Sequence, residues 1–157
     1  MNYSAAFFLL ISFFLFVSPS HGQQKDSPMP NNVIFAQGGT VFVNGHLAAG
    51  LERRIWSQPN DAFHFYGGLG YGRYRAALFF SGAGPRAHIS GFTGAGAHHF
   101  EISLATYYLP STDTTPDEGG FGPDLSIGYR YMRPEGGFVF KGFVALTGVG
   151  IGLGLGF

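Results

Sequence analysis

The chain contains no cysteine and few charged residues. Without cysteine, disulfide bonds and thiolate metal sites are excluded, so an exported form must owe its stability to the fold itself. Charged residues are only 11% of the 157 residues, less than half the share in a typical soluble domain. Nine basic residues balance nine acidic ones, and this balance argues against nucleic-acid binding, which requires a basic surface.

The N-terminal apolar stretch is too short for a membrane helix. Residues Ala5–Val17 are free of charge, but a helix that spans a bilayer requires about 20 apolar residues. This length is typical of a secretory signal peptide, and the small residues Ser20 and Gly22 suit cleavage after Gly22. We therefore expect residues 1–22 to be a signal peptide and 23–31 a flexible periplasmic lead-in; an uncleaved anchor helix is the alternative.

Glycine and aromatic residues are abundant: the chain has 26 Gly, 18 Phe and 8 Tyr. Glycine every few residues disfavours long helices, and a period of two indicates strands instead. The pattern is clearest over residues 148–157, where glycine alternates with Val, Ile, Leu and Phe. In a membrane barrel, such a strand turns its apolar face to lipid and its glycine face to the lumen.

The same period divides the rest of the mature chain into strands. Eight strands are an even number, as a barrel with both termini on one side requires. The sequence therefore predicts an all-β fold over residues 32–157: an up-and-down, eight-stranded antiparallel transmembrane β-barrel. The predicted strands are 32–41, 45–56, 63–78, 86–93, 98–108, 123–132, 137–146 and 149–157.

With both termini in the periplasm, the connections divide into two groups. The longest and most polar one, 109–120, then lies outside the cell, where long barrel loops belong. The competing interpretation is a soluble periplasmic barrel, which would expose glycine, alanine and few charges to water. The predicted periplasmic turns are 57–62, 94–97 and 133–136, and the predicted external loops are 41–44, 79–85, 109–120 and 147–148.

Aromatic residues gather near the predicted strand ends. This placement is typical of the girdles that membrane proteins carry at both interfaces with water. The candidates are Trp56, Phe63 and Tyr131 on the periplasmic side, and Tyr108 and Phe121 on the outer side.

Five charged residues fall on the inward face of the predicted strands. Buried charges are costly unless they pair, so we expect a luminal ionic network in which the carboxylates are shared among the cations. The alternative is a gated path for protons or small ions. The five residues are Glu52, Arg54, Glu101, Arg130 and Lys141.

The lumen of an eight-stranded barrel is just wide enough for side chains to fill. The glycine face of the last strand leaves one side of it bare. Either Tyr66, Tyr107 and Phe143 lean across to fill this side, or a small wet cavity remains; the sequence leaves both open.

Catalytic and metal-binding patterns are weak. The histidines do not match the spacing of a zinc site, so we expect neither a metal nor a cofactor. Ser90 lies two residues from His88, and Ser103 two from Glu101, but a third partner for a catalytic triad is missing. We expect no enzyme activity; an outer-membrane hydrolase that modifies lipid A is the alternative.

Several segments resemble small outer-membrane β-barrel proteins of Bacteroidota. They are 51–54 (LERR), 126–131 (SIGYRY), 133–141 (RPEGGFVFK) and the final GLGF. The resemblance implies insertion by the outer-membrane assembly machinery, which in such proteins recognises a last strand ending in an aromatic residue. Phe157 matches that position. The resemblance implies no enzyme activity.

Together these features predict a small, monomeric outer-membrane barrel with a lumen filled by side chains. Its partners would be outer-membrane lipid and, through the C-terminal strand, the assembly machinery. We expect a structural or interaction role at the cell envelope; the alternatives are a channel for small solutes or ions, and a lipid-modifying enzyme.

Overall fold

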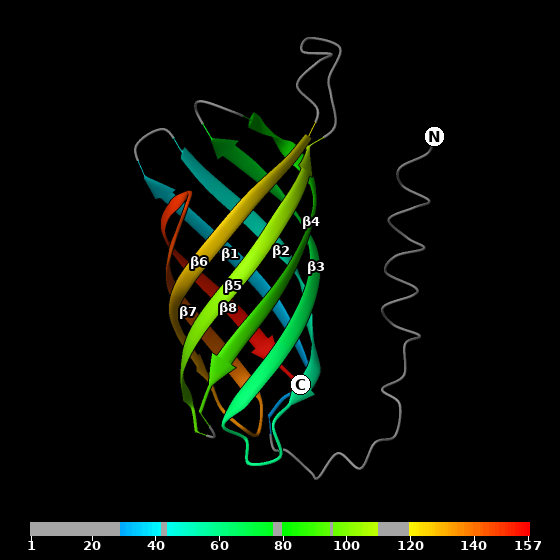
Figure 1. Ribbon diagram of the computed structural model, residues 1–157, viewed down its shortest axis with the longest axis vertical. Helices are drawn as coiled ribbons and strands as arrows, with labels where there is room; N and C mark the ends of the chain where they lie inside the picture. Colours follow the sequence, from blue (N-terminus) through cyan, green and yellow to red (C-terminus); the bar gives the residue numbers. More distant parts are fainter. Residues whose placement is uncertain (1–28, 42–43, 77–79, 95, 110–119) are drawn as a thin grey trace, which may run out of the picture.

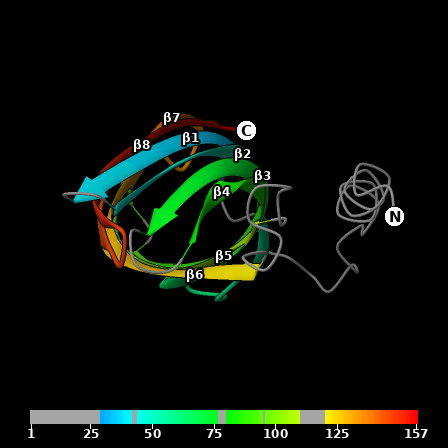
Figure 2. The same cartoon turned by 90° about the horizontal axis from the view of Figure 1, so that it is seen from above.

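The computed structural model describes residues 29–41, 44–76, 80–94, 96–109 and 120–157. It is all-β: eight antiparallel strands follow one another around a closed barrel (Figures 1 and 2). This confirms the predicted fold class. The strands are β1 (Asn32–Val41), β2 (Asn44–Ser57), β3 (Phe63–Ala76), β4 (Phe80–Thr93), β5 (His98–Leu109), β6 (Gly120–Met132), β7 (Gly137–Ala145) and β8 (Gly148–Gly156).

The first and last strands close the barrel. β1 pairs with β8 from Val33↔Gly156 to Thr40↔Val149. Beyond this ladder, the Asn32 N–H donates to the Phe157 carbonyl at 2.8 Å. The start of β1 and the C-terminus therefore lie at one end of the barrel, which we call the terminal end; we call the opposite end the far end (Figure 1).

Side chains alternate between the two faces of the wall, apart from one irregularity in β2 between Arg54 and Trp56. Along β5, exposed and buried residues alternate from His98 to Ala105. In β8, Ile151 is 59% exposed, and its glycine neighbours face the lumen. Within the part of the chain that is described, no helix is long and apolar enough to cross a membrane. The predicted signal peptide lies outside the described residues.

Neighbouring side chains fill the space beside two of the inward glycines of β8. A Cβ added to Gly150 would lie 2.5 Å from the Phe143 ring, and one added to Gly156 would lie 2.8 Å from Pro30. Tyr66 and Tyr107 are fully buried. The glycines of β8 are thus covered by side chains of the adjacent strand β7 and of the segment before β1.

Two apolar clusters occupy the lumen. One lies near the terminal end and the other near the far end, so that the central lumen lies between them. The first consists of Met29, Val33, Phe35, Tyr66, Phe92, Met132 and Val139, and the second of Ala48, Tyr74, Tyr107 and Leu109.

Residues 29–31, expected to belong to a flexible lead-in, are packed against the barrel. Met29 is only 2% exposed, and the Tyr66 hydroxyl donates to the Pro30 carbonyl. The Asn31 side-chain oxygen accepts from Arg54 at 2.6 Å. This segment is ordered because Met29 completes the apolar cluster at the terminal end; the predicted lead-in residues 23–28 lie outside the described residues.

β4 begins at Phe80, so the predicted external loop 79–85 is wrong for residues 80–85. Pro85 is unusual inside a strand because proline has no N–H for a sheet ladder. Residues 80–85 pair with β3, whereas the pairing of β4 with β5 extends only to Arg86↔Tyr107. β4 is therefore an edge strand at Pro85, where a missing N–H costs little. Pro123 also lies where its strand is paired on one side only: it pairs with Thr106 of β5, but β6 pairs with β7 only from Ser126 onward.

Candidate functional site: the luminal charge cluster

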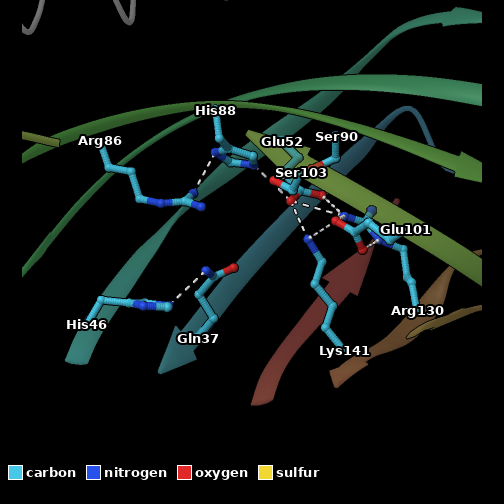
Figure 3. A network of polar contacts seen from close by, with 10 residues as sticks. All are labelled: Gln37, His46, Glu52, Arg86, His88, Ser90, Glu101, Ser103, Arg130 and Lys141. Carbon is cyan, nitrogen blue, oxygen red and sulfur yellow. Dashed lines mark hydrogen bonds and ion pairs between the residues drawn. The ribbon is translucent and has the colours of Figure 1, made fainter. Parts of the chain in front are cut away.

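Five strands direct charged or polar side chains to one region of the lumen (Figure 3). The region contains Glu52 of β2, His88 of β4, Glu101 of β5, Arg130 of β6 and Lys141 of β7. We call these five residues the luminal charge cluster. All five are buried, so their charges must be neutralised inside the barrel.

The wall leaves room for the two carboxylates. The partner of Glu52 across the β2–β3 ladder is Gly68, and the partner of Glu101 across the β5–β6 ladder is Gly128. Neither glycine has a side chain beside the carboxylate. Long cations from other strands can therefore reach both acids.

Arg130 forms a two-pronged ion pair with Glu101. Its Nε donates to Oε2 at 2.7 Å and its Nη2 to Oε1 at 2.9 Å. The same Nη2 lies 2.9 Å from Glu52 Oε2, so Arg130 bridges both carboxylates. The guanidinium carbon also lies 4.5 Å from the centre of the Phe92 ring, a distance typical of a cation–π contact.

Lys141 supplies the second bridge. Its Nζ lies 2.5 Å from Glu52 Oε1 and 3.2 Å from Glu101 Oε1. Two carboxylates and two cations thus alternate in space, and their formal charges cancel. Such a closed arrangement offsets the desolvation cost that each charge carries alone.

His88 and Arg86, which the sequence did not assign to the network, extend it toward the far end. The Arg86 guanidinium donates to His88 Nδ1 at 2.6 Å, so His88 must carry its proton on Nε2. This Nε2–H donates to Glu52 Oε1 at 2.9 Å. The signal in the sequence was that positions 86 and 88 share one face of a strand, but the sequence suggested only metal binding or catalysis for His88.

Arg54, the fifth residue of the predicted network, binds the segment that precedes β1. Its Nη2 donates to Asn31 at 2.6 Å and its backbone N–H to the Asn31 carbonyl at 2.8 Å. A β-bulge follows immediately, since the β2–β3 register shifts between Arg54 and Trp56. Arg54 therefore lies closer to the terminal end than Glu52 and binds the segment that packs there.

A second polar chain occupies the far half of the lumen. Gln37 Nε2 lies 3.3 Å from His46 Nε2, and His46 Nδ1 lies 2.7 Å from the Thr147 hydroxyl. That hydroxyl donates to Asp124 at 3.3 Å. All four residues are buried, so this chain keeps polar groups of β1, β2 and β6 satisfied away from water.

The serines considered as nucleophiles bond to each other. The Ser90 hydroxyl donates to Ser103 at 3.1 Å, and both nitrogens of His88 are occupied by Arg86 and Glu52. Over the described residues, no three His, Asp or Glu residues gather as a metal ion requires.

A small cavity lies beside Lys141. Its volume of about 10 Å³ matches a single water-sized sphere. Gln37, Glu101, Ser103 and Ser126 contribute to its lining.

The predicted girdle residues lie at strand ends. Near the terminal end, Trp56 packs against Phe65 with ring centres 5.8 Å apart, and Phe63 begins β3. Tyr131 packs against His98 at the same end. At the far end, the rings of Tyr108 and Phe121 are 5.4 Å apart.

Phe157, the predicted assembly signal, follows directly after β8 and is 62% exposed. Its backbone bonds to Asn32 continue the pairing of the closing strands. Comparisons with protein-family models, with curated proteins and with solved structures found no match for the chain.

Proposed function

We propose that the chain is a monomeric integral outer-membrane barrel with both termini in the periplasm. In this proposal its lumen is closed, and the protein has a structural or interaction role in the cell envelope. The terminal end faces the periplasm and the far end faces the outside.

One observation carries the proposal: the polarity of the barrel is inverted. The outward face carries large apolar side chains on neighbouring strands, among them Leu47 (66% exposed) and Ile151 (59%). The inward face carries the luminal charge cluster and a wall of glycine. A barrel in lipid requires this arrangement, because its outer surface meets hydrocarbon.

A soluble barrel fits the same wall poorly. It would keep its aliphatic face inside and its charges outside. If this barrel were soluble, its outward apolar face would be exposed to water. That face is much larger than the exposed apolar patches of ordinary soluble proteins. The buried ion pairs would meanwhile replace the apolar core that drives folding in water.

Closure of the lumen favours a structural role over conduction. An apolar cluster lies on each side of the luminal charge cluster, and the cavity beside Lys141 matches only one water-sized sphere. A conducting lumen requires a continuous wet path with charges accessible to the permeating ion.

Fractionation with a heat-modifiability gel tests the proposal. The full chain, expressed in a Gram-negative host, should co-fractionate with the outer membrane. Unboiled samples should migrate differently from boiled ones, because a folded barrel resists detergent. Recovery in the soluble periplasmic fraction, with identical migration before and after boiling, would overturn the proposal.

A substitution of Phe157 tests whether this residue is the assembly signal. Phe157→Ser should reduce the folded fraction in the outer membrane, because the last strand would no longer end in an aromatic residue. Gln58→Ala, at an exposed turn position, is the control and should match the wild type. If both variants assembled equally well, Phe157 would not be the assembly signal.

A further inference from the structure

The outward face of β3 changes from apolar to positively charged along its length. From the terminal end it carries aromatic and apolar residues up to Tyr71, and then two arginines, Arg73 and Arg75. Both arginines are exposed. Because strand residues two apart share a face, the two guanidinium groups project from the same side of the wall.

Strand geometry places these arginines at the edge of the apolar band. Phe63 and Arg73 are ten residues apart, which is about 33 Å along a strand. With a tilt of about 40°, this corresponds to about 25 Å along the barrel axis, the height of the lipid-facing band in outer-membrane barrels. Arg75 then lies about 5 Å farther out, at the depth of lipid headgroups.

The neighbours of the two arginines are small or apolar. Arg73 pairs with Leu47 and Ala83, and Arg75 pairs with Gly45 and Ser81. Gly45 and Ser81 leave the Arg75 side chain open on both sides, with room for a bulky headgroup.

No carboxylate of the described residues neutralises these arginines. Glu52, Glu101 and Asp124 are buried in the lumen, and Asp61 and Glu135 lie in turns at the terminal end. Among the described residues, the outward rim of β3 therefore presents two positive charges without a carboxylate partner at the far end.

We propose that Arg73 and Arg75 bind a phosphomonoester on a glycolipid headgroup of the outer leaflet. Arginine matches phosphate oxygens with two parallel N–H donors. A phosphomonoester carries close to two negative charges at neutral pH, which matches two guanidinium groups. The phosphodiester of an ordinary phospholipid carries one. The inference rests on the proposed function, which places this rim in the outer leaflet.

Native mass spectrometry of the refolded barrel in detergent tests this inference. The probes are diphosphoryl lipid A, its dephosphorylated form and phosphatidylglycerol. The wild type should retain diphosphoryl lipid A at least tenfold more tightly than either other lipid. The double variant R73Q/R75Q should lose this preference. Arg133→Gln, at an exposed arginine of the opposite end, is the control and should keep it.

Three outcomes would overturn the inference: equal retention by R73Q/R75Q, no effect of removing the phosphates, or equal binding of phosphatidylglycerol. A heat-modifiability gel of each sample separates this failure from that of the proposed function. A barrel that folds into lipid without a phosphate preference refutes the glycolipid site alone. A chain that does not fold into lipid refutes the proposed function.

Discussion

Glu52 accepts hydrogen bonds or ion pairs from three side chains: Arg130, Lys141 and His88. It is fully buried. Without Glu52, each of these partners would have N–H groups that lack this acceptor in an interior of low polarity. Unpaired polar groups are costly there. The stability of the luminal charge cluster therefore depends on this one carboxylate more than on any single cation.

Glu52→Gln should lower the free energy of unfolding by about 3–5 kcal/mol, because a buried pair loses one partner while the cations remain. Urea unfolding of the barrel in liposomes measures this loss. Glu135→Gln, at an exposed turn position, is the matched control and should change stability by less than about 0.5 kcal/mol. Equal effects of the two substitutions would contradict a paired role for Glu52.

Gly68 provides the space for the His88 ring. A Cβ at this position would lie 2.0 Å from His88 Cε1, and the ring is held by bonds to both Arg86 and Glu52. Gly68→Ala should therefore cost about 1–3 kcal/mol, the usual range for overpacking. The same urea unfolding experiment measures it.

Gly96→Ala is the control for this substitution, since an added Cβ there would meet no atom within 4 Å. It should leave stability close to that of the wild type. If Gly68→Ala were equally harmless, the ring of His88 would not be fixed where the structure places it.

Among the strands, β8 shows most clearly what the barrel wall requires: space for side chains on the inside and apolar side chains on the outside. Its glycines leave room for Phe143 and Pro30 inside the barrel, and its alternate residues expose Ile151 and Leu153 outside. The depth of a residue along such a strand should decide how well it tolerates charge.

Ile151→Arg, near the middle of β8, should destabilise the barrel in lipid by about 2–4 kcal/mol. Leu146→Arg, in the β7–β8 connection at the far end, should cost about 0–1 kcal/mol, because arginine near the interface reaches water. Folding equilibria in liposomes measure both. Equal costs at the two depths would contradict a lipid-facing β8.

At the scale of the whole molecule, closure of the lumen depends on parts that are distant in sequence. Met29 precedes β1 but packs with Met132 of β6 and Val139 of β7. Tyr107 of β5 packs with Tyr74 of β3 at the other end. The charges in between therefore have little access to either side.

The wild type should give no single-channel current in planar bilayers, and neither should Glu101→Gln. Both apolar clusters remain in this variant, so a lost charge between them opens no path. A porin reconstituted in the same bilayers is the positive control. Discrete current steps in the wild type that change in Glu101→Gln would favour the alternative of a gated ion path.

Much of the architecture followed from the period of two. Alternation along the chain predicted eight strands and the inward position of Glu52, Glu101, Arg130 and Lys141. These are local properties, because successive strand residues must point to opposite faces whatever the strand pairs with. The structure has the eight strands in the predicted order, and Glu52, Glu101, Arg130 and Lys141 are buried inside the barrel.

Strand ends were harder to predict at Pro85 and Pro123. A proline suggests a boundary because it cannot donate to a ladder. Whether a proline ends a strand depends on whether the adjacent strands on both sides are paired with it at that position. This pairing is a property of the whole sheet.

The alternation of residues along the chain was enough to predict the barrel and the presence of balancing charges on its inward face. Which charges meet could be seen only after the strands were paired. Arg54 and Glu52 are close in sequence, yet Arg54 binds Asn31, whereas His88 from a distant strand binds Glu52. The physical reason is the tilt and stagger of the strands, which set the height of each residue in the lumen and arise only when the sheet closes.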